Sequence, residues 1–429
     1  MSAPKSLRSP VPLPHPDGPL SPYRVLDFSD VKGQLCGRLL AELGADVIKV
    51  EPRGGDPTRE RGPFYRDQPG EERSLVWWAL NAGKRSITLE LRLEEGRELA
   101  RCLAEKADIV IQTFRPGEAK ALGLEYATLA KRNPGIVVVS ITNFGLTGPY
   151  RHKEATDIVG SAMGGHMMLN GDPERGPVRT TAPQAYTQAN VQACVGALIA
   201  LYARWNNGGR GQLVDVSMQE AMANTMDNAQ QTWDIRRVNP RGPGLRRNRD
   251  GLPGPRYLYE AADGWVACLA YGGLVGPASE AIVAWLAEYG EAGELTSPAW
   301  RHRLQGLQPL SPEEGAYLEE RLAAFCRRFP KDWLVAEAQQ RGAGWAPVYS
   351  PREIVECEQL RAREYWVRVH HEDLGETFVY PGAPFRLSRT PWRQRGRAPH
   401  VGEHNAEVYG ELLGIDSATL RRLRLRMVI

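Results

Sequence analysis

The sequence has 429 residues, of which 42% are hydrophobic and 24% are charged, and its formal net charge is +3. This is the composition of a globular protein long enough for two domains, and so small a net charge argues against a nucleic-acid-binding protein. Because no apolar run approaches the length of a membrane span, we do not expect a membrane protein either.

Six cysteines lie far apart in the chain, with no CxxC pair and no Cys/His spacing typical of a metal site. This pattern is typical of reduced thiols, so we expect a cytoplasmic protein without disulfides or a bound metal. Residues 1–22 are rich in proline and serine and lack the apolar core of a signal peptide. They predict a flexible N-terminal extension.

Residues 23–28 and 45–51 have the pattern of buried strands, and residues 34–43 between them have the pattern of a helix. Such a βαβ unit favours a parallel sheet. The alternation then continues, with strands predicted at 86–91, 108–111 and 136–141 and helices at 94–106, 117–122 and 126–132. The fold class predicted is therefore α/β, with residues 23–235 forming a large Rossmann-like domain around an open, mostly parallel sheet. The absence of a GxGxxG fingerprint argues against a nicotinamide cofactor.

The rest of the chain predicts a change of architecture. Residues 187–204 combine small and apolar side chains, which favours a closely packed, buried helix. Residues 236–256 are rich in Pro, Gly and Arg and are interpreted as a linker. Residues 257–350, with a strand pair and amphipathic helices, predict a smaller α+β domain, and residues 351–429 are expected to return to the large domain and complete it.

Several short motifs occur in an order and at a spacing that resembles the class III CoA-transferase (CaiB/BaiF) family. They include LGADVIKVEP at residues 43–52, FRPG at 114–117 and FGLTGPY at 144–150. The other matching segments are residues 25–29, 55–59, 81–87, 122–124 and 210–216, with weaker matches at 402–404 and 412–414. The resemblance therefore covers about residues 23 to 429.

The resemblance implies an interlocked dimer whose N-terminal domain binds a CoA thioester, with coenzyme A or acyl-CoA and an organic acid as substrates and no covalently bound cofactor. It places Val31 and Leu122 against the adenine. Thr113 stands where the family has an asparagine, which weakens one polar contact that the resemblance implies.

Three cations are candidates for direct contact with CoA. Lys84, Arg85 and Arg115 lie beside predicted strand ends, where open α/β sheets bind ligands, and the planar guanidinium fork suits phosphate oxygens. The alternative interpretation is that these cations are solvated surface charges or structural anchors. The residues alone leave both interpretations open.

The motif that carries the family's nucleophile departs from the family pattern. The family reads Pro-x-Ala-Asp-x-x-x-Gly where residues 183–190 lie here, and its catalytic aspartate is replaced by Tyr186 and its glycine by Asn190. A carboxylate is ionised at neutral pH and offers an acyl carbon that can carry CoA, whereas a phenol has a pKa of about 10 and no acyl carbon. Tyr186 is therefore not expected to act as a nucleophile.

Other side chains near this motif do not replace the missing carboxylate. Asp157 is better explained as a structural hydrogen-bonding residue, and Asp172 and Glu174 as solvated residues of a turn. The racemase branch of the family places a histidine where Thr156 stands and an aspartate at the Tyr186 position, so racemisation is not expected. His166, a lone histidine, is interpreted as a packed or hydrogen-bonded residue.

Three functions remain open. The leading interpretation is a pseudoenzyme-like subunit of a heteromeric CoA-transferase, similar to benzylsuccinate CoA-transferase, whose active site is carried by a related Asp-bearing subunit. The second is a CoA-binding regulatory homodimer. The third is an enzyme of altered chemistry on CoA thioesters, in which Tyr186 is a general acid.

Overall fold

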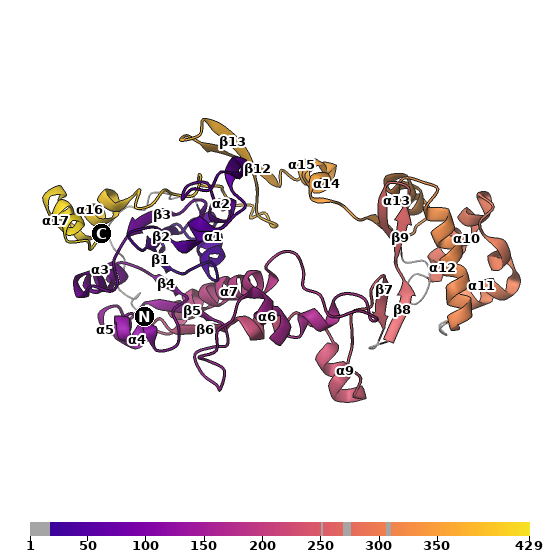
Figure 1. Cartoon of the computed structure of the whole chain (residues 1–429), viewed down its shortest axis with the longest axis horizontal. Helices are drawn as coiled ribbons and strands as arrows, with labels where there is room; N and C mark the ends of the chain where they lie inside the picture. The colour runs from indigo at the N-terminus through magenta and orange to yellow at the C-terminus, as the bar shows by residue number, and fades with distance from the viewer. Residues whose placement is uncertain (1–17, 250–251, 269–275, 306–309) are drawn as a thin grey trace. The chain divides into compact units, whose positions relative to one another are not determined.

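The computed structural model describes residues 18–249, 252–268, 276–305 and 310–429, and the chain forms two compact units (Figure 1). The first unit comprises the chain up to Gly164, Thr181–Thr225 and Glu358–Ile429. The second comprises Gly165–Thr180 and Met226–Cys357. Both units are therefore discontinuous in sequence. Among the described helices, none has both the length and the apolar character needed to cross a membrane.

The first unit alternates strands and helices along most of its length. Its strands are β1 (Arg24–Phe28), β2 (Asp46–Glu51), β3 (Arg85–Thr88), β4 (Ile109–Gln112), β5 (Val137–Thr142), β6 (Leu213–Ser217), β12 (Trp366–His371) and β13 (Glu376–Pro381). Its helices are α1 (Gln34–Glu42), α2 (Leu75–Asn81), α3 (Glu94–Glu105), α4 (Glu118–Leu122), α5 (Tyr126–Arg132), α6 (Asp157–Met163), α7 (Gln184–Asn206), α8 (Met218–Ala223), α15 (Glu358–Ala362), α16 (Asn405–Leu413) and α17 (Ser417–Leu425). Short 3₁₀ helices are η1 (Pro57–Glu60) and η2 (Tyr65–Asp67).

Six strands form one sheet in the order β3-β2-β1-β4-β5-β6, and every neighbouring pair is parallel. The predicted Rossmann-like α/β fold is therefore confirmed. The order reverses between β1 and β4, and in open α/β sheets ligands bind beyond the carboxyl ends of the strands at such a switch point. The strand β3 ends at Thr88, opposite Glu51, so residues 89–91 leave the sheet earlier than the sequence predicts.

Helices cover both faces of this sheet (Figure 1). One hydrophobic core joins the strands to α1, α7 and α8, and a second joins the opposite face to α3, α5, α16 and α17. The strands β1 to β5 are buried along their whole length between two helical layers. The sequence predicts a buried helix at residues 187–204. In the structure α7 buries only one side against the first unit, and its other side is exposed.

The N-terminal part of the described chain is packed rather than extended. The Leu20 side chain is buried, and its N–H donates a 3.0 Å hydrogen bond to Leu43 O at the end of α1. Gly44 has φ of +112°, and a Cβ there would lie 2.7 Å from the Cα of Gly18, so this close approach requires glycine. Residues 1–17 of the expected N-terminal extension lie outside the described residues.

The second unit has its own core, built around Trp285, Trp345 and Phe325. Its strands are β7 (Arg246–Arg249), β8 (Leu252–Arg256), β9 (Leu258–Ala261), β10 (Gly264–Ala267) and β11 (Ala346–Pro347). Its helices are α9 (Ala229–Arg236), α10 (Gly276–Glu288), α11 (Pro298–Gln305), α12 (Pro312–Cys326), α13 (Lys331–Gln340) and α14 (Pro351–Glu356), with 3₁₀ helices η3 (His166–Leu169) and η5 (Gly293–Thr296). The predicted strand pair forms the antiparallel β9 and β10, which confirms a smaller α+β unit.

The segment expected to be a linker contains regular structure. Within residues 236–256, β7 and β8 pair in antiparallel fashion with an irregular register between Arg246 and Asn248. Arg246 donates two hydrogen bonds of 2.7 Å to the carboxylate of Glu319 on α12. This bidentate pair ties the segment to the second unit, although its composition resembles that of a linker.

Candidate functional site

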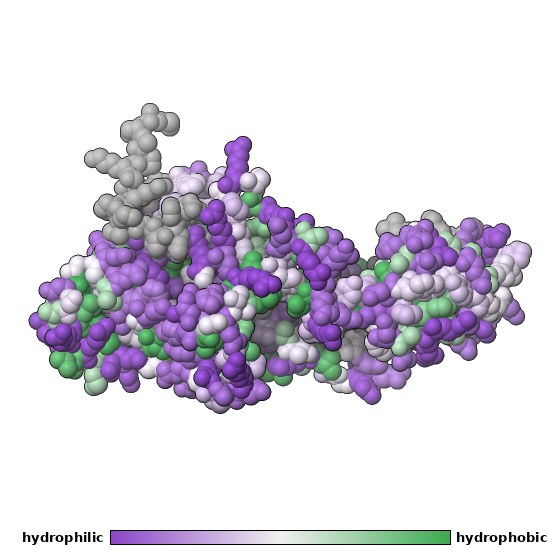
Figure 2. Space-filling view, turned by 90° about the horizontal axis from the view of Figure 1, so that it is seen from above, coloured by the Kyte–Doolittle hydropathy of each residue, from purple (hydrophilic) through white to green (hydrophobic). Residues whose placement is uncertain are grey.

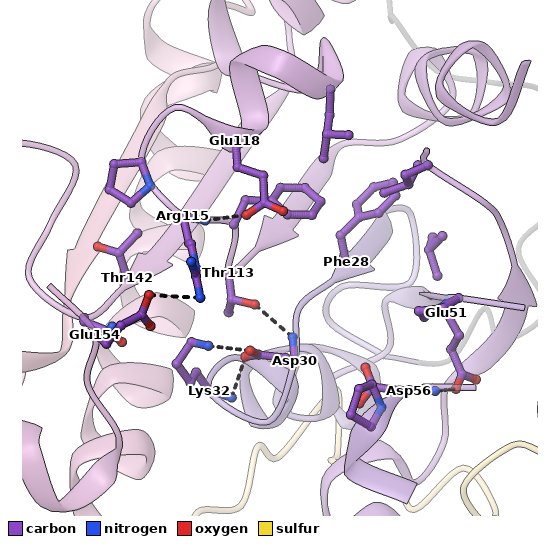
Figure 3. Close-up of a pocket in the computed structure, with 18 of the residues that line it drawn as sticks. Phe28, Asp30, Lys32, Glu51, Asp56, Thr113, Arg115, Glu118, Thr142 and Glu154 are labelled. Carbon is purple, nitrogen blue, oxygen red and sulfur yellow. Dashed lines mark hydrogen bonds and ion pairs between the residues drawn. The ribbon is translucent and has the colours of Figure 1, made fainter. Parts of the chain in front are cut away.

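A cavity of about 910 Å³ lies in the first unit, beyond the carboxyl ends of the parallel strands (Figure 3). Its wall is built from the residues that directly follow β1, β2, β3, β4 and β5. Because the sheet order reverses between β1 and β4, the cavity lies at the switch point where an α/β sheet binds a ligand. Its volume is that of a small-molecule site.

Part of the cavity wall is apolar and aromatic. Phe28 at the end of β1 and Phe114 after β4 have ring centroids 6.1 Å apart, tilted by 41°. Leu122 at the end of α4 lines the same cavity and packs against the same core. This wall offers flat apolar contacts of the kind that suit a planar heterocycle.

Cations with carboxylate partners line other parts of the cavity. Arg115 forms an ion pair of 2.9 Å with Glu154, and Lys32 pairs with Asp30 (Figure 3). The Arg115 pair is largely exposed, so it contributes little to stability and its charge remains accessible to an anionic ligand.

The loop after β5 contributes two further cations. The Nζ atom of Lys153 lies 4.0 Å from the centroid of the Tyr150 ring, within cation–π range. Arg151 donates to Nε2 of His152 at 3.0 Å. In the described part of the chain, neither Lys153 nor Arg151 has a carboxylate partner, so both can receive phosphate oxygens.

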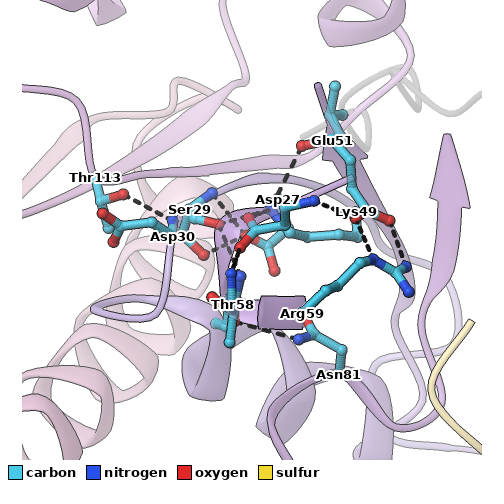
Figure 4. Close-up of polar contacts among 12 residues, drawn as sticks. Asp27, Ser29, Asp30, Lys49, Glu51, Thr58, Arg59, Asn81 and Thr113 are labelled. Carbon is cyan, nitrogen blue, oxygen red and sulfur yellow. Dashed lines mark hydrogen bonds and ion pairs between the residues drawn. The ribbon is translucent and has the colours of Figure 1, made fainter. Parts of the chain in front are cut away.

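A buried ionic network forms the floor beside the cavity (Figure 4). The Nζ atom of Lys49 lies 3.1 Å from Oδ2 of Asp56 and donates to Ser29 O at 2.6 Å. Burial alone would raise the pKa of the Asp56 carboxyl, but the charge of Lys49 and the N–H of Thr58 outweigh it and lower this pKa. Burial would lower the pKa of Lys49, and the surrounding carboxylates, Asp56 first, raise it instead. The pair is therefore charged at neutral pH.

The same network continues through a bidentate contact between Arg59 and Glu51, which also lines the cavity. Arg59 donates to both carboxylate oxygens of Glu51 at 2.8 Å, and its guanidinium lies 3.7 Å from the centroid of the Trp77 ring. Arg59 also donates to Pro399 O at 2.9 Å, which fastens the C-terminal segment to the region of the cavity floor. These contacts hold the floor in one arrangement.

Of the residues predicted to bind CoA, some line the cavity and others do not. Thr113, Arg115 and Leu122 line the cavity together. Val31 is half-buried between Asp30 and Lys32, which both line it.

Lys84 and Arg85 do not line the cavity. Lys84 is buried, and its Nζ lies 2.7 Å from Asp27 Oδ2 and donates to Asn81 Oδ1 at 2.8 Å. Burial lowers the pKa of Lys84 more than the charge of Asp27 raises it. Arg85 forms an ion pair of 2.7 Å with Asp46. Both cations are thus engaged within the fold.

The sequence analysis did not select five cavity-lining cations, Lys32, Lys49, Arg92, Arg151 and Lys153. Arg92 follows β3, and Arg151 and Lys153 lie in the long loop after β5, next to the FGLTGPY motif. Their position shortly after strand ends was the one feature of the sequence that could have identified them as candidates. Which of them face the cavity depends on the path of each loop, which the sequence pattern does not encode.

Tyr186 lies in the first turn of α7, and its backbone is held on both sides. Its N–H donates to Oδ1 of Asp157 at 3.1 Å, and its carbonyl accepts from Nδ2 of Asn190 at 2.7 Å. The same Nδ2 donates to Lys32 O at 2.7 Å, which links Tyr186 to a cavity-lining residue. Burial raises the pKa of the Tyr186 phenol, so it is neutral at physiological pH.

The neighbouring candidates for a carboxylate or base occupy structural roles. Asp157 is buried and accepts the Tyr186 N–H. Asp172 and Glu174 lie in the second unit, where the Glu174 N–H donates to Asp172 Oδ1 at 3.0 Å. In the same unit, His166 Nδ1 lies 3.0 Å from Nδ2 of Asn170. Asp157, Asp172 and His166 each take part in a contact within their own unit.

Comparisons with known proteins show the family of the chain. Residues 20–405 match the model of CoA-transferase family III. The chain is 35% identical to the succinyl-CoA:(R)-benzylsuccinate CoA-transferase subunit BbsE of Thauera aromatica, over 91% of this chain and 93% of that one. It is 30% identical to the succinyl-CoA–L-malate CoA-transferase beta subunit of Chloroflexus aurantiacus, over 96% and 98% of the two chains.

A solved structure resembles the chain over a similar length. The crystal structure of a CaiB/BaiF family protein from Brucella suis has a TM-score of 0.78 and 28% sequence identity, and the match covers 92% of this chain and all of that one. The motifs, the sheet topology, the cavity at its switch point and these matches agree. The chain belongs to CoA-transferase family III, the CaiB/BaiF family.

Proposed function

We propose that this chain is the non-nucleophilic subunit of a heteromeric CoA-transferase that moves CoA between an acyl-CoA and a carboxylic acid. A related chain with an aspartate at the position of Tyr186 supplies the nucleophile. The observation that carries this proposal is the tyrosine itself, since Pro183 and Ala185 keep the family pattern around it while the carboxylate is lost.

The chemistry of CoA transfer explains why the tyrosine is decisive. A catalytic carboxylate attacks the thioester carbonyl and forms a mixed anhydride, which releases CoA as a thiolate. The thiolate then attacks the acyl carbon of the enzyme's own carboxyl, which releases the donor acid and leaves an enzyme–CoA thioester. Tyr186 could at most become a phenyl ester, and its side chain has no carbonyl carbon that the CoA thiolate could attack.

The cavity supports a role of this subunit in binding CoA. The apolar wall of Phe28, Phe114 and Leu122 suits the adenine ring, and Lys153 and Arg115 suit the phosphates. Anionic groups bound by these cations gain charge-assisted hydrogen bonds, which are stronger than neutral ones. The buried floor at Lys49 and Asp56 keeps these walls in place.

The names of two relatives support a second chain. The Thauera aromatica relative and the Chloroflexus aurantiacus relative are each named as a subunit. By analogy, the partner of this chain would be a family member that keeps the aspartate. The two chains together would contain one complete nucleophile motif and two CoA cavities.

Altered chemistry through Tyr186 receives less support. A general acid works best when its pKa lies near the working pH. Burial raises the pKa of Tyr186 above its ordinary value of 10, which makes the phenol a weaker acid than free tyrosine. A CoA-binding homodimer remains as an alternative outcome of the test below.

The test is mild affinity purification of this chain from its native cells, followed by native mass spectrometry and CoA-transfer assays. We expect a complex with a related chain that carries the aspartate. We expect transfer activity from the pair and none from this chain alone. The matched control is the pair in which the partner's aspartate is replaced by asparagine, which should be inactive. Transfer by this chain alone at the rate of the pair would contradict the proposal.

A further inference from the structure

A second, smaller cavity is lined only by residues of the second unit. Its volume is about 180 Å³. Two segments that lie far apart in the sequence build it. Residues 168–177 belong to the stretch between α6 and α7, and residues 241–242 follow α9. None of the residues that line this cavity lines the first one, so it calls for a ligand of its own.

The two walls of this cavity are joined through the main chain. The N–H of Gly242 donates to Met168 O at 2.9 Å, and the N–H of Gly244 donates to Gly171 O at 2.8 Å. A Cβ on Gly242 would lie 2.4 Å from the carbonyl carbon of Asn170, so this close approach requires glycine. The two segments are therefore fixed to each other independently of the side chains that line the cavity.

Each wall contributes one arginine. Arg175 and Arg241 both line the cavity, and both are exposed. Polar residues cover much of the surface in view in Figure 2, so the exposure of an arginine does not by itself indicate a site. These two differ because they meet at one cavity from distant segments, and because neither guanidinium has a carboxylate partner within the described part of the chain. Each planar fork can therefore bind a carboxylate through two parallel hydrogen bonds.

The charge of the cavity wall favours an anion. Arg175 and Arg241 supply two positive charges, and Asp172 is the one carboxylate among the lining residues. The Oδ1 atom of Asp172 accepts the N–H of Glu174 at 3.0 Å, which engages this carboxylate in its own turn. The lining residues therefore carry a net positive charge, which attracts an anionic ligand.

The size of the cavity limits the ligand to a small molecule. Its volume is the volume that about six water molecules occupy in the liquid, since each has a share of about 30 Å³. A CoA thioester is far too large for it, whereas an acid of a few carbon atoms fits. Met168, Pro173 and Pro177 supply apolar contacts for a short hydrocarbon chain. A small organic acid therefore matches both the charge and the size of the cavity.

We propose that this cavity binds one carboxylate of a small dicarboxylic acid, the organic acid of the transfer reaction. This inference rests on the proposed function, which requires two kinds of ligand, a CoA thioester and a carboxylic acid. Because the thioester does not fit the cavity, the acid is the ligand of the reaction that matches it. Arg175 and Arg241 are then residues that determine the specificity for the acid.

The need for a second carboxylate follows from the chemistry of the transfer. The reacting carboxylate attacks the enzyme–CoA thioester through an oxygen and forms a mixed anhydride. The displaced CoA thiolate then attacks the acyl carbon of the acid, which restores the enzyme's carboxylate. Hydrogen bonds from two guanidinium groups stabilise the charge of a carboxylate and so make it a weaker nucleophile. The carboxylate bound by Arg175 and Arg241 is therefore the one that does not react.

The first experiment measures binding to the purified full-length chain by isothermal titration calorimetry. The probes are succinate, butyrate, which has the same chain length and one carboxylate, and butyramide, which has none. The variants are Arg175→Gln and Arg241→Gln. The matched control is Arg179→Gln, which changes an exposed arginine of the same segment that does not line the cavity. Circular dichroism and thermal unfolding check that each variant is folded.

We expect succinate and butyrate to bind and butyramide not to bind. Arg175→Gln and Arg241→Gln should each weaken succinate binding by at least about tenfold, as for the loss of a hydrogen bond to a charged group. Arg179→Gln should bind succinate as the wild type does. The affinity for CoA should be the same in all four proteins, because the arginines do not line the first cavity.

The second experiment assays the complex of this chain with the aspartate-bearing chain, with succinyl-CoA as donor and isotope-labelled succinate or butyrate as acceptor. We expect transfer to succinate. Butyrate should inhibit in competition with succinate and receive no CoA, because the arginines hold its only carboxylate. Arg175→Gln and Arg241→Gln should raise the KM for succinate by at least about tenfold and leave the KM for succinyl-CoA within about twofold.

Equal succinate affinity in all three variants, or binding of butyramide as tight as that of succinate, would overturn this inference and leave the proposed function standing. So would a complex that transfers CoA to butyrate as well as to succinate, or to neither acid while the arginine-dependent binding persists. Because the binding experiment uses this chain alone, its result does not depend on the partner. Transfer by this chain alone at the rate of the pair would instead overturn the proposed function.

Discussion

The N–H of Tyr186 donates a 3.1 Å hydrogen bond to Oδ1 of Asp157, so the buried carboxylate nearest to this motif in the sequence supports the backbone of the motif. Asp157 is the first residue of α6, and it accepts a hydrogen bond from the first turn of α7. This contact gives Asp157 a structural role. We therefore propose no nucleophilic role for Asp157.

The substitution Asp157→Asn tests this assignment. Asparagine keeps an oxygen that can accept the Tyr186 N–H but cannot act as a nucleophile, so we expect the pair to retain its transfer rate. Asp157→Ala leaves the N–H without this acceptor and should lower the free energy of unfolding by about 1–3 kcal/mol. Urea unfolding and steady-state assays measure the two effects. A transfer-dead Asp157→Asn with normal stability would make Asp157 catalytic.

The substitution Tyr186→Phe removes the phenol oxygen and keeps the ring that packs against the core. Because the raised pKa keeps this phenol neutral and unreactive, we expect the pair to keep its kcat within about twofold. Steady-state kinetics of the pair measure this. A loss of activity of a hundredfold or more would instead favour Tyr186 as a general acid.

The substitution Lys153→Met should weaken CoA binding by this chain. Lys153 lines the cavity without a carboxylate partner in the described part of the chain, and a hydrogen bond to a charged group contributes about 1.5–3 kcal/mol, or about tenfold or more in affinity. Calorimetric titration with CoA measures the change, and high salt should reduce the difference. The control Lys131→Met changes an exposed lysine of α5 outside the cavity. Equal affinities of the two variants would contradict the assignment.

The buried pair of Lys49 and Asp56 predicts an acid limit for the folded state. The pKa of Asp56 is below its ordinary value of 3.8, so its contribution is present above pH 3.8 and is lost as the pH falls through the folded-state pKa. The raised pKa of Lys49 places the matching loss at alkaline pH, above 10.5. Between these limits the pair is fully charged.

Asp56→Asn should therefore destabilise the chain by about 3–5 kcal/mol at pH 7, because it leaves the Lys49 charge buried without its carboxylate partner. The double variant with Lys49→Met should lose less than the sum of the single losses. Urea unfolding at pH 7 and pH 3.5 measures both. If Asp56→Asn loses as much stability between these pH values as the wild type, Asp56 is not the group that titrates.

The sequence predicted the sheet well because its signal is local. The strands β4 and β5 consist mainly of Val and Ile, and such runs predict buried parallel strands without any tertiary information. The helix α7 shows where this reasoning ends. Its composition indicates burial on every side, but the chain buries only one side of it. Composition alone does not reveal this difference.

The site was harder to predict because it depends on distant partners. Lys84 was a candidate for CoA contact, but its partner Asp27 lies 57 residues away in the chain, and nothing local to Lys84 reveals that pair. Lys153 was not selected, although it lines the cavity, because the path of its loop is set by tertiary packing. Arg115 was selected because it lies close after the predicted strand that forms β4, and Thr113 because of the family resemblance.

The most direct test of the account is intact-mass spectrometry of the purified complex after reaction with acyl-CoA in the absence of an acceptor acid. The enzyme–CoA thioester accumulates under this condition, and its added mass reports which chain carries the nucleophile. We predict the CoA adduct on the aspartate-bearing partner alone, with the mass of this chain unchanged. A CoA adduct on this chain would contradict the central claim that it is the non-nucleophilic subunit.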